Sequence, residues 1–226
     1  MRRSGWVLVA AAAGGAGWAV AELARPRRVD IREFDPDEVA RLETAMWRSY
    51  YDRRRLPLFG QLVALLQGQF HLQPLRAVAL AGLAARAAAV FQVGASHPDY
   101  RRALPYLERY YAAIRAVSEV PFDPRRAAWL ELEWWIVHRE VDDHPPGDLE
   151  AALAALAAEL YQVPAERLWT HAARRAEAMT NRDRTSRREV GVLDDDWDRI
   201  EAVRWVAWKA LADEVRTARA EEAQEA

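Results

Sequence analysis

The sequence predicts an all-α protein: an N-terminal single transmembrane helix followed by a seven- to eight-helix bundle-like domain. Two observations predict this fold class. Residues 4–21 form an uncharged, largely apolar stretch, and the rest of the chain carries apolar residues at helical spacing between Pro, Gly and Asp stops. No segment shows the alternation of apolar and polar residues that is typical of a strand.

Residues 1–24 are interpreted as a transmembrane anchor. A helix over residues 4–24 covers roughly 30 Å, the thickness of the hydrocarbon core of a bilayer. The same layout fits a secretory signal peptide that is cleaved near Ala21, because basic residues precede the apolar stretch and small residues end it. We expect the anchor, because the stretch is longer than the roughly 7–15 apolar residues of a usual signal peptide. Export after cleavage is the alternative.

Residues 25–34 are expected to form a short basic juxtamembrane linker that holds the domain at the membrane surface. Arginines after the apolar stretch outnumber the two that precede it, and basic flanks remain on the cytoplasmic side. The sequence therefore predicts a single-pass protein of the cell membrane with a cytoplasmic domain. The flanking arginines after the stretch are Arg25, Arg27, Arg28 and Arg32.

The all-α domain is expected over residues 35–217, with a frayed tail over 218–226. Asp35 and Pro36 mark the start of its first helix, and Pro105 is expected to bend the fourth. The arginines between residues 174 and 188 are interpreted as a solvated helix face. The expected helices cover residues 35–54, 57–71, 74–93, 98–119, 123–142, 146–161 and 164–188, and the last starts at 194.

Composition and motifs exclude several classes of function. The chain has 32 basic and 34 acidic residues and a net charge of −2, which argues against a nucleic-acid surface. It has no cysteine, which removes disulfides, thiolate nucleophiles and cysteine-bound metals. It contains no Gly-x-Ser-x-Gly, no glycine-rich phosphate loop and no His-Glu-x-x-His.

Arg86 is the lone charge of the apolar segment 77–94, which we expect to be a central helix. Because an unpaired buried charge costs several kcal/mol, Arg86 predicts a nearby carboxylate. The candidates are Glu43, Glu131 and Glu133, with Glu131 favoured. Such a pair is either a structural ion pair of the core or part of a cavity for a small ligand. The predicted ligand-binding residues are Glu43, Arg86, Glu131, Trp135 and His138.

No cofactor and no metal are expected. The Glu-x-x-His signature of di-iron bundles is absent from the sequence. A metal held by residues of separate helices is the remaining metal alternative, and those residues would be Glu43, Glu131, His138 and His171.

The sequence thus favours a membrane-anchored, all-helical interaction or scaffold protein. Its expected partners are the lipid bilayer and a protein within the membrane, and nucleic acid is not among them. The alternative is a helical-bundle protein or enzyme that binds a small molecule at a buried Glu/Arg/His cluster, with or without a metal.

Overall fold

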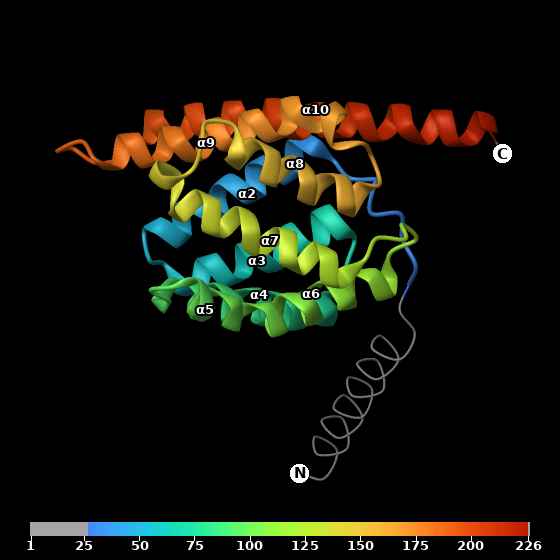
Figure 1. Ribbon diagram of the computed structural model, residues 1–226, viewed down its shortest axis with the longest axis horizontal. Helices are drawn as coiled ribbons and strands as arrows, with labels where there is room; N and C mark the ends of the chain where they lie inside the picture. Colours follow the sequence, from blue (N-terminus) through green and yellow to red (C-terminus); the bar gives the residue numbers. More distant parts are fainter. Residues whose placement is uncertain (1–26, 226) are drawn as a thin grey trace, which may run out of the picture.

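The computed structural model describes residues 27–225 and shows an all-helical domain, which confirms the all-α fold class (Figure 1). Within these residues the one contact of strand type is an isolated bridge between Val29 and Ser118. The predicted anchor lies outside the described residues. The long helices are α2 (Pro36–Tyr51), α3 (Arg55–Phe70), α4 (Pro74–Val93), α6 (Leu104–Val117), α7 (Pro124–Arg139), α8 (Asp148–Tyr161), α9 (Trp169–Ser186) and α10 (Asp194–Glu225).

Aspartate caps fix where two of these helices begin. The Asp35 carboxylate accepts a hydrogen bond of 2.9 Å from the backbone N–H of Asp37, and Pro36 occupies the first turn of α2. Asp123 does the same for α7, accepting from the backbone N–H of Arg125 at 2.8 Å. A short side-chain acceptor before a proline satisfies the free N–H groups at a helix start. Both starts were predictable from the sequence.

The long helices form a closed ring. Each packs against the next long helix along the chain, and α10 packs against α2 to close the circuit. In Figure 1, α10 lies along one side of the domain, and α4, α6 and the short helix α5 (His97–Tyr100) lie along the opposite side. The buried apolar side chains fill the space inside this ring.

The predicted helix over residues 98–119 is divided into three pieces. The chain passes from α5 through a 3-10 turn at Arg101–Ala103 into α6. Pro105 lies in the first turn of α6 rather than at a bend inside a longer helix. A proline is tolerated there because the first N–H groups of a helix have no acceptor within it.

The C-terminal segment also differs from the expectation. α10 continues to Glu225, so that residues 218–225, which were expected to fray, are helical. Ion pairs connect this end of α10 to other segments. Arg32 lies 3.0 Å from Glu222, and Arg167 lies 2.7 Å from Glu221. These contacts give the last turns of α10 partners outside the helix.

The bounds of α4 match the predicted ones, but its burial does not. Its buried residues lie on one face, and the opposite face is exposed. Among the described residues, α4 is the one helix that is long and apolar enough to cross a membrane by length and composition. Because only the inward face is covered, the expectation that this segment is a central helix is wrong. The buried residues of α4 are Ala77, Leu80, Ala81 and Ala87.

Candidate functional site

Glu43 of α2 is the centre of a buried charged cluster. Its side chain faces the inside of the ring, and the residue is only 4% exposed. Oε1 accepts a hydrogen bond of 2.8 Å from Nη2 of Arg175, and Oε2 accepts one of 2.7 Å from the indole N–H of Trp208. Nη1 of Arg204 lies 3.1 Å from Oε2. The carboxylate thus joins α2, α9 and α10, and we call these four residues the Glu43 cluster.

Helical spacing places the cluster residues on the inner faces of their helices. Arg204 and Trp208 are four positions apart on α10 and share one stripe with buried Ile200 and Leu211. Arg175 follows His171 by one turn on α9, and both side chains point inward. The packing of α9 and α2 against α10 then brings these side chains together.

Arg204 is more deeply buried than any other charged residue of the domain that the structure describes, with an exposure of 1%. Its guanidinium carbon lies 3.1 Å from the centroid of the Trp47 ring, a cation–π stack. Its Nε has no hydrogen-bond partner within the described residues. Burial lowers the pKa of Arg204 to about 10; the charge of Glu43 opposes this shift, and that of Arg175 adds to it.

In the other two ionisable residues of the cluster, Glu43 and Arg175, pairing outweighs the effect of burial on the pKa. Burial alone would raise the pKa of Glu43, but the charges of Arg175 and Arg204 and the hydrogen bonds from Trp208 and Arg175 lower it to about 2. Burial alone would lower the pKa of Arg175, yet the charges of Glu43 and Glu131 raise it. Glu43 is therefore ionised at neutral pH, and Arg175 is its more favourable cation.

His171 lies beside the cluster as a neutral residue. Its Nδ1 is 2.9 Å from the backbone oxygen of Ala207, and its ring contacts the edge of Trp208. Because a carbonyl oxygen can only accept, Nδ1 carries the proton and donates. Burial, with the charge of Arg175, lowers the pKa of His171 to about 4. This histidine does not carry a charge at neutral pH.

Glu131 of α7 is the centre of a second, smaller group. Its Oε2 accepts a hydrogen bond from the hydroxyl of Tyr111 and its Oε1 accepts one from the indole N–H of Trp135, both at 2.8 Å. Burial, then the negative charge of Glu131, raises the pKa of Tyr111 well above its usual range. The tyrosine is therefore a hydrogen-bond donor and not a base.

The structure brings the five predicted site residues together only in part: the charges of Glu43 and Glu131 both act on Arg175. Glu131 and Trp135 are hydrogen-bonded as neighbours on α7, but Glu43 pairs with α9 and α10. His138 lies 3.1 Å from a carboxylate oxygen of Asp183 on α9. Arg86 lies apart from all of them.

The prediction of a buried Arg86 is wrong. Arg86 is exposed on the outer face of α4, and its guanidinium lies 5.7 Å from the centroid of the Tyr106 ring. Within the part of the chain that the structure describes, it makes no ion pair with Glu43, Glu131 or Glu133. An arginine in water needs no carboxylate partner, because solvent stabilises its charge.

The true partners of Glu43 were missed for two different reasons. Arg204 and Trp208 share an apolar stripe in the sequence, and an arginine on such a stripe is the signal that predicts a buried cation. Arg175 was interpreted as part of a solvated face because arginines crowd that helix. Its spacing from His171 and from the buried Met179 places it on the inner face instead.

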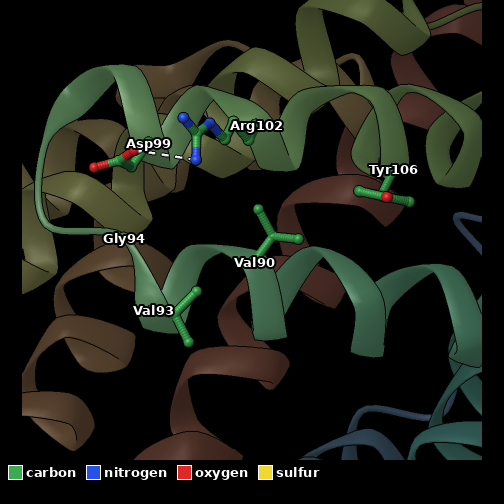
Figure 2. A pocket seen from close by; sticks show the side chains of 6 residues that line it. All are labelled: Val90, Val93, Gly94, Asp99, Arg102 and Tyr106. Carbon is green, nitrogen blue, oxygen red and sulfur yellow. Dashed lines mark ion pairs between the residues drawn. The ribbon is translucent and has the colours of Figure 1, made fainter.

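Two of the surface hollows of the described domain lie away from the Glu43 cluster, which lines neither of them. One has a volume of about 390 Å³ and lies between α4 and the α5–α6 region (Figure 2). The other, of about 110 Å³, lies between α9 and α10. The described residues contain no group of three His, Cys, Asp or Glu side chains placed to hold a metal ion.

Comparisons with protein-family models, with curated proteins and with solved structures find no significant match to this chain.

Proposed function

We propose that this protein is a membrane-anchored helical module that acts by interaction, as a scaffold or adaptor at the membrane surface. The proposal depends on where the chain, coming from the predicted anchor, first forms hydrogen bonds with the domain. The backbone N–H of Val29 donates to the oxygen of Val117 at 2.8 Å, and the N–H of Glu119 donates to the oxygen of Val29 at 2.8 Å. The chain is therefore held to the domain as early as Val29.

Only residues 22–28 connect this attachment point to the apolar stretch 4–21. A segment of this length reaches at most roughly 25 Å even when it is fully extended. If the stretch crosses the bilayer, the domain has no freedom to leave the membrane surface. Such a short tether suits a module that meets partners at the membrane.

The interior of the domain supports the same proposal. The carboxylate of Glu43 is held by Arg175, Arg204 and Trp208, and that of Glu131 by Tyr111 and Trp135. These charged groups are engaged in joining helices to one another. An interaction module needs a rigid interior of this kind and uses its outer surface for recognition.

Alkaline carbonate extraction of membranes from cells that make the full chain tests the anchor. We expect the chain to remain in the membrane pellet with residues 1–21 intact by mass spectrometry. Leu8→Arg with Ala12→Arg should release it, because each arginine inside the apolar stretch costs about 3 kcal/mol. The control is Ala202→Arg with Ala220→Arg on α10, which should leave the chain in the membrane pellet. A soluble chain that begins after Ala21 would replace the anchor by a cleaved signal.

A second candidate function rests on Arg204. Its buried Nε without a partner is the kind of donor that a small carboxylate or phosphate would accept from. Thermal unfolding of the full chain with acetate, succinate and inorganic phosphate tests this. A rise in melting temperature that is lost in Arg204→Met, but kept in Arg86→Met, would support a ligand site. No rise with any of the three anions would end this candidate.

A further inference from the structure

We infer that the outer face formed by α4 and α6 rests on the surface of an anionic phospholipid bilayer. This α4–α6 face is defined by exposed small and apolar residues of α4 together with Tyr106 and exposed arginines. The inference rests on the proposed membrane anchor and adds which side of the domain the membrane covers. The residues of the face are Val78, Gly82, Ala85, Ala89 and Val93 with Tyr106, Arg86, Arg102 and Arg109.

The apolar part of this face has no partner within the described residues. Val78 is 45% exposed and Val93 is 83% exposed. Between them Gly82, Ala85 and Ala89 recur at helical spacing, and all three are exposed. A surface helix of a soluble domain normally turns polar residues outward, so this apolar stripe indicates a surface that is covered in use.

Cations and a tyrosine border the apolar stripe. Arg86 extends from α4 over the ring of Tyr106 on α6, and Arg102 lies across the hollow from Val90 and Val93 (Figure 2). Asp99 pairs with Arg102 at 3.4 Å, and Glu108 is the exposed carboxylate of α6. Arginine stems and tyrosine rings suit the boundary between lipid chains and headgroups, because each combines an apolar body with a polar end.

The charge of the domain is distributed in a way that orients this face toward anionic lipid. Residues 74–117 contain six arginines against Asp99 and Glu108, a net charge of +4. Residues 194–225, which form α10 on the opposite side in Figure 1, contain ten acidic and five basic residues, a net charge of −5. Near an anionic membrane each arginine raises partitioning about fivefold, whereas α10 is repelled.

The position of the tether agrees with this orientation. Val29 is bonded to the backbone on both sides of Ser118, the residue that directly follows α6. The chain therefore joins the domain beside the C-terminal end of α6, and the residues that follow, Asp30 and Arg32, pair with Arg219 and Glu222 of α10. A tether attached there keeps the C-terminal end of α6 near the bilayer.

The face lies on the membrane rather than crossing it. α4 alone satisfies the length and composition of a span, but it packs along α6. A spanning α4 would carry the exposed Glu108 and Arg109 of α6 into the hydrocarbon core, where charged side chains are costly. Shallow contact leaves these charges among the headgroups.

The natural absence of cysteine allows a direct test with the full chain. Single variants Ala85→Cys and Ala89→Cys, with Ala202→Cys on α10 as the matched control, are labelled with an environment-sensitive dye. Each is reconstituted into vesicles of phosphatidylcholine and phosphatidylglycerol that carry a nitroxide lipid. We expect strong quenching by the nitroxide at positions 85 and 89 and protection from aqueous iodide. Position 202 should show weak quenching by the nitroxide and free access to iodide.

Charge reversal provides the second arm. Arg86→Glu with Arg109→Glu should reduce lipid quenching at position 85 severalfold, and so should vesicles of phosphatidylcholine alone. The same reversal at Arg199 and Arg216 of α10 is the control and should leave quenching unchanged. Iodide access at position 85 equal to that at position 202, in chains that stay with the vesicles, would overturn the inference. Disulfide dimers through position 85 without lipid quenching would overturn it in favour of a second copy.

The outcome separates this inference from the anchor proposal. If position 85 shows lipid quenching but carbonate releases the chain from the vesicles, the anchor proposal fails and the contact of the α4–α6 face with lipid stands. If the chain remains with the vesicles in carbonate but iodide reaches position 85, the anchor proposal stands and the contact of the α4–α6 face with lipid is wrong.

Discussion

Arg175 and Glu43 are joined by a hydrogen bond of 2.8 Å although 132 positions separate them along the chain. The bond connects α9 to α2 inside the ring, and Arg204 adds a second cation to the same carboxylate. A buried carboxylate between two arginines is costly to disrupt by removing one partner, because the remaining charges have no solvent to stabilise them.

Glu43→Gln is expected to destabilise the domain by about 3 to 5 kcal/mol, because it leaves two arginine charges buried without their anion. Urea unfolding followed by circular dichroism measures the change. Glu133→Gln is the matched control: Glu133 is exposed on α7, and the same change there should alter stability by less than about 0.5 kcal/mol. Equal effects of the two variants would contradict the buried-cluster argument.

Arg175→Met should cost more stability than Arg204→Met. Pairing raises the pKa of Arg175, so its charge is favoured in the fold, whereas burial lowers the pKa of Arg204 and disfavours its charge. We expect about 3 kcal/mol for Arg175→Met, a smaller loss for Arg204→Met, and a change within about 0.5 kcal/mol for exposed Arg86→Met. The reverse order for the two buried arginines would show that Arg204 is the principal cation of Glu43.

Replacing the whole charged triad is expected to be far milder than removing its anion. The triple variant Glu43→Leu, Arg175→Met, Arg204→Met should lose no more than about 2 kcal/mol, since apolar residues of similar volume avoid the desolvation of the charges and only the indole N–H of Trp208 loses its acceptor. Thermal unfolding of the triple variant beside Glu43→Gln provides the comparison. If the triple variant is as unstable as Glu43→Gln, the charged groups do more than join the helices to one another.

Stability should fall on acidification in two separate steps. The pKa of His171 is lowered from 6.5 to about 4, so between these values the unfolded chain binds a proton that the fold does not, and up to about 3 kcal/mol is lost as the pH falls. The pKa of Glu43 is lowered from 4.5 to about 2, so its contribution is lost only below pH 4.5. His171→Gln should remove the upper step and keep the lower one in unfolding free energies measured against pH.

Much of the fold was predictable because local signals mark the helix boundaries. Pro74 and Val93 bound α4 as expected, and Asp35 and Asp123 cap helices where the sequence places them. What the sequence could not supply is which face of an apolar helix is covered. α4 is nearly uncharged on all sides, so composition alone did not reveal that Arg86 points to solvent.

The candidate site was predictable only in part for a related reason. Glu43 was only one of three candidate partners for Arg86, and its actual partners are Arg175 and Arg204, because the partner depends on which helices adjoin α2. That neighbour is α10, the last of the described helices, and no local pattern reports a contact between helices so far apart in the sequence. Glu131 and Trp135 were found together because they lie one turn apart on the same helix.

The contact between α2 and α10 also dictates an order of events during synthesis. Glu43 leaves the ribosome early, yet both arginines that neutralise it and the helix that covers α2 are translated much later. Until then the carboxylate of Glu43 is solvated, and the apolar side chains of α2 that α10 covers are exposed. Completion of the native state therefore waits for termination of translation, and contacts so distant in sequence form slowly. A truncated message that ends before codon 194 is expected to yield a species that chaperones and proteases recognise.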